Sequence, residues 1–138
     1  MSAEEWGQRP RDWADLAEPS NEPLYAEVFG TLALAPGARL LDLACGSGYA
    51  ARMAAARGAQ VTGIDLAPEL LEIAAERLPE GLFVRAGIDA LPLPDAGFDV
   101  VTAFNALQFA DDPVAAAREA FRVLTTPTST ARRATCCT

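Results

Sequence analysis

Apolar and polar positions follow two different rhythms along residues 39–124. Short apolar runs with the length of buried strands lie at residues 40–44, 60–65, 82–86 and 98–104. Segments with the apolar spacing of helices lie at residues 49–57, 68–78 and from 112 onwards. This order of elements predicts one α/β domain, built on a parallel sheet with helices packed against it.

Two of these helices show which faces should be buried. In residues 68–78 leucines and alanines share one face, whereas Glu69, Glu72 and Glu76 stay in water. The helix that starts at Asp112 and Pro113 is expected to turn one apolar stripe towards the core, made of Val114, Ala117, Phe121 and Leu124. Each helix is therefore expected to pack through a single face.

The first 35 residues differ from this core and contain both tryptophans of the chain. Residues 12–18 and 22–34 look helical, with Asn21 placed to cap the second helix and Pro23 in its first turn. Pro36 and Gly37 end that helix. We therefore separate an N-terminal helical segment, residues 1–35, from a core of residues 36–124.

The last 14 residues, 125–138, break the pattern. They contain six threonines and no large apolar residue, so no further buried strand is expected there. We expect a disordered tail. The alternative hypothesis is that the native reading frame ends at Leu124.

Composition excludes several kinds of chemistry. The 138 residues include 19 acidic and 11 basic side chains, all of the latter arginines, and no histidine, for a net charge of −8. A Ser/His/Asp triad, a histidine-bound metal, a Schiff-base lysine and a P-loop lysine are therefore impossible. The acidic balance also argues against binding nucleic acid.

Uncharged stretches, the N-terminal residues and the cysteine spacing indicate where the protein resides and whether it binds a metal. The longest stretch without a charged residue has 11 residues, too short for a membrane-spanning helix. The acidic N-terminus resembles neither a secretory signal nor a transit peptide, so we expect a cytoplasmic protein without membrane association. Cys45, Cys136 and Cys137 lack the spacing of a disulfide framework or a zinc site, and no metal is expected.

A glycine-rich bend follows the first predicted strand. Gly46 and Gly48 allow a sharp turn, and amides at the start of the next helix are available to an anionic group. Asp65 ends the second predicted strand, where a carboxylate can accept hydrogen bonds from ribose hydroxyls. Together these features indicate a nucleoside-containing cofactor. Residues 46–51 also fit the dinucleotide fingerprint, which leaves an NAD-binding domain of an oxidoreductase open, but Asp42 inside the strand favours a cationic ammonium group.

Five blocks of the chain resemble the class I S-adenosylmethionine-dependent methyltransferases, in their small-molecule branch. The blocks are residues 40–48, 61–65, 91–95, 98–101 and 118–124, within a similarity that covers roughly residues 24–124. The resemblance implies a Rossmann-like, doubly wound parallel sheet in a three-layer αβα arrangement. It also implies S-adenosyl-L-methionine as cofactor and a small-molecule methyl acceptor as partner. In the family the N-terminal segment is a lid on the acceptor side.

The resemblance also implies roles for individual residues. The cofactor-binding positions would be Asp42, Ala44, Cys45, Gly46, Gly48, Asp65, Leu66, Ile88, Asp89, Ala103 and Phe104. Asp42 would meet the methionine ammonium group, Asp65 the ribose and Ile88 the adenine. The family usually has an acid where this chain has Gly87, and Asp89 is the candidate that replaces it.

Methyl transfer from a sulfonium needs alignment and exclusion of water more than a base, so the absence of histidine is tolerable. An amine, a thiolate or an acidic hydroxyl would react by proximity, whereas a poorly acidic alcohol needs a base, for which only carboxylates or tyrosine remain. No catalytic residue is assigned. Candidates on the acceptor side are Trp13, Tyr25, Asn105 and Gln108, with Trp6 beside them.

Only about four of the family's seven strands are visible in the sequence. We interpret this as a truncation after Leu124, by a frameshift or a premature stop, that impairs the enzyme and leaves the strand at residues 98–104 as an exposed edge. A non-catalytic relic is a further alternative.

Overall fold

The computed structural model describes residues 2–125 and 133–137. The N-terminal segment contains α1 (Ala3–Gly7), α2 (Pro10–Asp12), the π-helical turn η1 (Trp13–Ala17), the 3₁₀ turn η2 (Glu18–Asn21) and α3 (Glu22–Leu32). The core contains β1 (Arg39–Leu43), α4 (Tyr49–Ala56), β2 (Gln60–Asp65), α5 (Pro68–Arg77), β3 (Leu82–Arg85), β4 (Val100–Phe104), the 3₁₀ turn η3 (Leu107–Phe109) and α6 (Pro113–Val123). Residues 133–137 form β5 (Arg133–Cys137).

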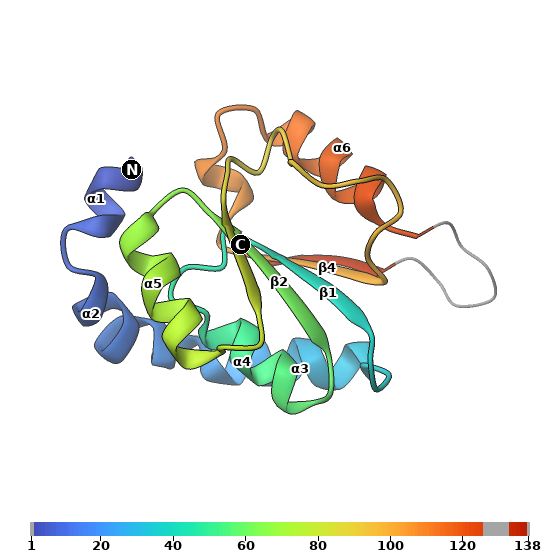
Figure 1. Ribbon diagram of the computed structural model, residues 1–138, viewed down its shortest axis with the longest axis horizontal. Helices are drawn as coiled ribbons and strands as arrows, with labels where there is room; N and C mark the ends of the chain where they lie inside the picture. Colours follow the sequence, from blue (N-terminus) through green and yellow to red (C-terminus); the bar gives the residue numbers. More distant parts are fainter. Residues whose placement is uncertain (1, 126–132, 138) are drawn as a thin grey trace.

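The strands form one parallel sheet in the order β3-β2-β1-β4-β5. Leu40 of β1 pairs with Val61 on one side and with Val100 on the other. The chain thus winds outwards from β1 in one direction and then in the other, which is the doubly wound arrangement expected from the sequence. Helices α3, α4 and α5 cover one face and α6 covers the opposite face (Figure 1).

The fifth strand corrects one expectation about the tail. Residues 133–137 pair in register with β4, from Val100 opposite Arg133 to Phe104 opposite Cys137, so β4 is not an edge strand. A parallel ladder is made by backbone groups, and an edge strand therefore does not require the large apolar side chains that the prediction looked for. Residues 126–132 and 138, also predicted to be disordered, lie outside the described residues.

Side chains alternate across the sheet and build two apolar clusters. One lies against α3 and α4 and contains Leu40 and Val100, and the other lies against α6 and contains Leu41 and Val101. Because neighbouring strand residues point to opposite faces, both layers of helices are anchored by the same two strands. β1 and β4 therefore form the rigid centre of the domain.

The buried face of α6 differs from the predicted stripe. Leu124 is buried as predicted, whereas Val114 and Phe121 are 59% and 53% exposed, and the helix buries Ala116, Ala120 and Val123 instead. The helix thus packs mainly through small side chains. A prediction that looks for large apolar residues does not find them.

The N-terminal segment also departs from prediction in detail. Helix α1 was not expected, and its N-terminus is closed by a capping box between Ser2 and Glu5. Residues 13–21 form the two short turns η1 and η2 instead of a regular helix. Asn21 stands at the N-cap of α3, but its side chain makes no capping hydrogen bond. None of the helices formed by the described residues is long and apolar enough to cross a membrane.

Candidate functional site

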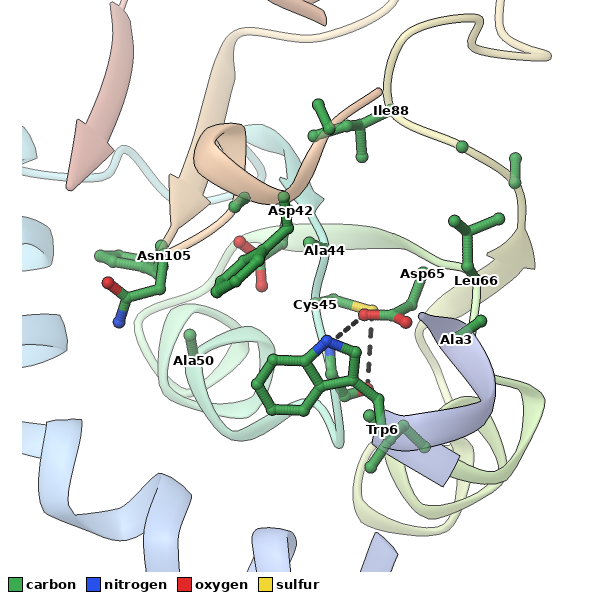
Figure 2. A pocket seen from close by; sticks show the side chains of 18 of the residues that line it. Ala3, Trp6, Asp42, Ala44, Cys45, Ala50, Asp65, Leu66, Ile88 and Asn105 are labelled. Atoms are coloured by element: carbon green, nitrogen blue, oxygen red, sulfur yellow. Dashed lines mark hydrogen bonds between the residues drawn. The ribbon is translucent and has the colours of Figure 1, made fainter. Parts of the chain in front are cut away.

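A pocket of about 470 Å³ opens above the carboxyl ends of the strands, where β1 separates β2 from β4. Open α/β sheets bind their ligands at this switch point, because the loops there leave in opposite directions. The walls come from the loops after β1, β2, β3 and β4 and from the N-terminal segment. Figure 2 shows Asp65 and Leu66 on one side of this space, with Ile88 and Asn105 across it and Trp6 along its rim.

The glycine bend after β1 is held by backbone conformation. Ala44, Gly46 and Gly48 all have positive φ angles, of 54°, 55° and 77°. This conformation costs little for glycine but is strained for alanine, so the bend at Ala44 is imposed by its surroundings. The Cys45 amide donates to the carbonyl of Ile64 in β2 at 2.9 Å, which ties the bend to the neighbouring strand.

Asp65 connects the bend to the loop after β2. The Gly46 amide donates to Oδ2 of Asp65 at 2.9 Å, and the Ala67 amide donates to Oδ1 at 2.9 Å. Burial raises the pKa of this carboxyl, although the amides of Ala67, Gly46 and Leu66 favour its charged form. Asp65 is not the N-cap of α5, a position taken by Ala67. Gly46 and Asp65 therefore line the same pocket in fixed relative positions.

Asp42 forms part of the pocket floor and is 3% exposed. The Thr102 hydroxyl of β4 donates to its Oδ1 at 2.7 Å. Burial raises the pKa of Asp42 to about 7, with a further contribution from the charge of Asp65. A carboxyl held in this way is stabilised in its ionised form by any cation that enters the pocket.

The loop after β3 supplies the wall opposite the bend. Ile88 is buried, and it lines the pocket beside Gly87 and Asp89. A methyl group added to Gly87 would lie 3.0 Å from Oδ1 of Asp89. The Asp89 carboxyl therefore occupies the space next to Gly87, where the family usually carries its acid.

Aromatic side chains close the side of the pocket nearest the N-terminus. Trp6 packs edge-on against Trp13, with ring centroids 5.0 Å apart, and against Phe109 at 5.8 Å. We call Trp6, Trp13 and Phe109 the aromatic arch. Tyr25 packs against Phe104 at 4.7 Å, and burial raises its pKa, so its hydroxyl stays protonated. Asn105, with a φ of 49°, lines the pocket beside them.

Three of the predicted site residues do not line this pocket. Gly48 is required for packing, because a methyl group at its Cα would lie 2.8 Å from Cβ of Ala74 in α5. Ala103 alternates with Phe104 along β4 and is buried on the α6 face of the sheet. Gln108 is exposed on η3. The other predicted positions line the pocket: Asp42, Ala44, Cys45, Gly46, Asp65, Leu66, Ile88, Asp89, Phe104, Trp13, Tyr25 and Asn105.

Glu18 is the main pocket residue that sequence reasoning missed. It is 3% exposed and accepts hydrogen bonds from the Ser47 hydroxyl and from Arg77. The helix predicted for residues 12–18 gave this glutamate no reason to be buried. Its position immediately before Pro19 was the available signal, because proline marks a change in the backbone.

Comparison with known proteins agrees with this geometry. A family model described as a methyltransferase domain matches residues 41–127, more than half of the chain. The malonyl-[acyl-carrier protein] O-methyltransferase of Serratia marcescens is 41% identical over 88 residues, which cover 64% of this chain and 34% of that protein. The 27-O-demethylrifamycin SV methyltransferase of Amycolatopsis mediterranei is 37% identical over 131 residues, covering 86% and 48%. The chain thus spans half or less of the length of these curated relatives.

Solved structures share the fold. The [4+2]-cyclase SpnF superposes with a TM-score of 0.70 at 33% identity, over 75% of this chain and 41% of that one. A Methanococcus maripaludis protein superposes with a TM-score of 0.75 over 91% of this chain and 60% of that one, and at 17% identity it shows the fold alone. The family match, the parallel sheet and the joined Gly46 and Asp65 agree with one another. The chain belongs to the class I S-adenosylmethionine-dependent methyltransferases.

Proposed function

We propose that this chain binds S-adenosylmethionine in the pocket above β1, β2 and β4 and transfers its methyl group to a small-molecule acceptor. One observation carries the proposal. The bend after β1 and the acid after β2 meet through the hydrogen bond from the Gly46 amide to Asp65, on the wall of a single pocket of about 470 Å³. This volume lies within the range of small-molecule sites.

The charges of the pocket fit the cofactor, which carries a sulfonium and an ammonium group. Five acidic residues are among the described residues that line the pocket, Glu18, Asp42, Asp65, Asp89 and Asp111, and no arginine is among them. Arg77, which donates to Glu18 and to the Ser47 hydroxyl, offsets only part of this negative charge. A ligand with positive charge therefore gains electrostatic energy there that a dinucleotide, with its anionic pyrophosphate, would lose.

Each wall of the pocket supports a role in this proposal. Asp65 would accept hydrogen bonds from the ribose hydroxyls, because its two oxygens are already oriented by backbone amides. Asp42 would face the ammonium group. Ile88 and Leu66 would enclose the adenine, and Asp89 would accept from its amino group.

When bound, the cofactor supplies a methyl group on a leaving group that is already activated. The chain's own residues then have to exclude water and orient the acceptor. The aromatic arch gives the acceptor side an apolar surface, and Tyr25 with its raised pKa is a poor general base. This favours an acceptor whose nucleophile is an amine, a thiolate or an acidic hydroxyl. The name of the rifamycin methyltransferase to which the chain is similar supports a small-molecule acceptor.

Thermal unfolding with S-adenosylhomocysteine tests the binding half of this proposal. The ligand is expected to raise the melting temperature of the wild type, since it binds only the folded state. Asp65→Ala should lose most of this shift, whereas Glu72→Ala, at an exposed position of α5, should keep it. NAD is the competing ligand, and a larger shift with NAD would contradict the proposal. Methyl transfer is then measured with labelled cofactor and a panel of amines, thiols and phenols.

A further inference from the structure

Glu18 is a buried acid that the roles above do not use. It begins η2, between the π-helical turn and the 3₁₀ turn of the N-terminal segment. Its side chain is 4% exposed, although most of the segment around it faces solvent and Leu16 is 76% exposed. A carboxyl is buried at this cost only where charged or hydrogen-bonding partners hold it.

The partners of Glu18 all belong to the core. Oε2 of Glu18 accepts from the Ser47 hydroxyl and from Nη1 of Arg77 at 3.3 Å. Arg77 in turn donates to the Ser47 hydroxyl at 2.7 Å and, through Nη2, to the carbonyl of Ala14 at 2.7 Å. We call Glu18, Ser47 and Arg77 the latch, because they fasten the N-terminal segment to the glycine bend and to α5.

The other carboxyl oxygen of Glu18 faces the pocket side of the bend. A methyl group added to Gly46 would lie 3.5 Å from Oε1 of Glu18 and 3.5 Å from Nε1 of Trp13. Gly46 lines the pocket, whereas Ser47 is fully buried behind it. One oxygen of the carboxyl is therefore committed to the latch, and the second lies where a ligand passes Gly46.

The charges around Glu18 leave it short of positive partners. Burial is the largest influence and raises the pKa of Glu18 to about 7, and the negative charge of Asp42 adds to this rise. Arg77 and the Tyr49 amide act in the opposite direction. Tyr25 of α3 is neutral, because burial and the charge of Glu18 raise its pKa. Glu18 thus shares its ionic partner Arg77 with Asp15, whereas Asp42 forms no ion pair with the described residues, and this leaves a net demand for a cation.

We propose that Glu18 binds the ammonium group of the cofactor's amino acid portion, beside Asp42, while its other oxygen keeps the latch closed. This inference rests on the proposed function and adds to it a binding residue from outside the Rossmann-like core. Because Glu18 belongs to the N-terminal segment, binding of the cofactor also fastens that segment, with Trp13 of the aromatic arch, over the loaded pocket.

Two ligands separate this role from a purely structural one. S-adenosylhomocysteine carries the ammonium group, whereas 5′-methylthioadenosine has the same adenosine and thioether without the amino acid portion. In Glu18→Gln, which keeps the size of the side chain and one accepting oxygen for Ser47 and Arg77, affinity for S-adenosylhomocysteine should fall about tenfold, or about 1.4 kcal/mol. Affinity for 5′-methylthioadenosine should change less than about twofold. Glu27→Gln on α3, exposed and outside the pocket, is the matched control and should bind both ligands as the wild type does.

Trypsin cleavage after Arg11 gives a second readout, since this side chain is 59% exposed and is followed by Asp12, whereas Pro10 blocks cleavage after Arg9. S-adenosylhomocysteine should slow the cleavage in the wild type more than 5′-methylthioadenosine does, and this difference should vanish in Glu18→Gln. Unchanged binding of S-adenosylhomocysteine in the variant, or an equal loss for both ligands, would overturn the assignment of Glu18. A wild type that binds neither ligand would instead overturn the proposed function, and this inference with it.

Discussion

The two sides of the pocket are built in different ways. On the cofactor side, backbone amides of Gly46 and Ala67 hold Asp65, and the bend is tied to β2 by a backbone hydrogen bond. On the acceptor side, the aromatic arch joins residues near the N-terminus to η3 through side chains alone. One half of the site is therefore held by backbone hydrogen bonds between adjacent strand ends, and the other by side-chain packing between distant segments.

The largest loss of stability is expected from a substitution at Gly48, in the bend on the cofactor side. Gly48→Val would place a β-branched side chain at a φ of 77° and its Cβ 2.8 Å from Ala74. Backbone strain and overpacking together should lower the free energy of unfolding by about 2 to 5 kcal/mol. Urea denaturation measures this change.

Gly30 provides the matched control for that substitution. It lies in α3, and a methyl group added there would meet nothing within 4 Å. Gly30→Ala should therefore leave stability unchanged or raise it by about 0.5 to 1 kcal/mol. Equal destabilisation by both substitutions would show that glycine at position 48 is not required for the contact with α5.

The second-largest loss of stability is expected at Arg77, which attaches the N-terminal segment to the core. Arg77→Met removes the cation of the latch and leaves the Glu18 carboxyl and the Ala14 carbonyl without that donor. At pH 8 this should cost about 2 to 4 kcal/mol in urea denaturation, because a buried charge loses its partner. Trypsin should also cut the N-terminal segment faster.

Arg118→Met is the control for Arg77→Met, because Arg118 is exposed on α6. Its stability should stay within about 0.5 kcal/mol of the wild type. If Arg77→Met behaved like this control, the latch would contribute nothing to the position of the segment.

The difference between the two sides of the pocket also explains which features could be predicted from the sequence. The strands, the bend and Asp65 follow from apolar runs, glycines and an acid at fixed spacing, and the structure confirms their positions. These features show as residue types at short, regular spacings within single segments of the sequence. By contrast, the latch requires Glu18 to meet Ser47 and Arg77 across the fold, and no periodic pattern encodes that meeting.

Other predicted positions lie differently in the structure for the same physical reason. Gly48 does not line the pocket, and its glycine is needed where α4 and α5 approach each other. Of the two alternatives Ala103 and Phe104, Phe104 lines the pocket, whereas Ala103 belongs to the cluster on the α6 face of the sheet. Val114 and Phe121 were assigned to the core by size, whereas α6 packs through alanines. Tertiary contact decided each of these cases.

A change of pH sharpens the comparison, because the three carboxyls whose pKa values are raised, Glu18, Asp42 and Asp65, all line the pocket. The pKa of Asp42 rises from 3.8 to about 7 and that of Glu18 from 4.5 to about 7 on folding. The folded state thus binds more protons, and stability without ligand should fall as pH rises from about 4 to 7. We expect a loss of about 1 to 4 kcal/mol between pH 5 and pH 8, measured by urea denaturation.

Asp42→Asn tests this origin of the pH dependence. The amide oxygen of asparagine can still accept from the Thr102 hydroxyl, while the titrating group is gone. The slope of stability against pH should therefore become shallower, with Glu18 and Asp65 supplying what remains. A variant with the full slope of the wild type would place the titrating groups elsewhere in the chain.

The smallest loss of binding is expected at Asp89, the candidate that replaces the acid usually found in the family at the position of Gly87. If the Asp89 carboxyl receives the adenine amino group in place of an acid at Gly87, Asp89→Asn should weaken S-adenosylhomocysteine binding by about threefold to tenfold. S-inosylhomocysteine has a carbonyl oxygen in place of that amino group, so the variant should bind it no more weakly than the wild type does. Calorimetry with both ligands gives the coupling between side chain and amino group. A parallel loss for the two ligands would show that Asp89 maintains the shape of the loop and does not recognise the amino group.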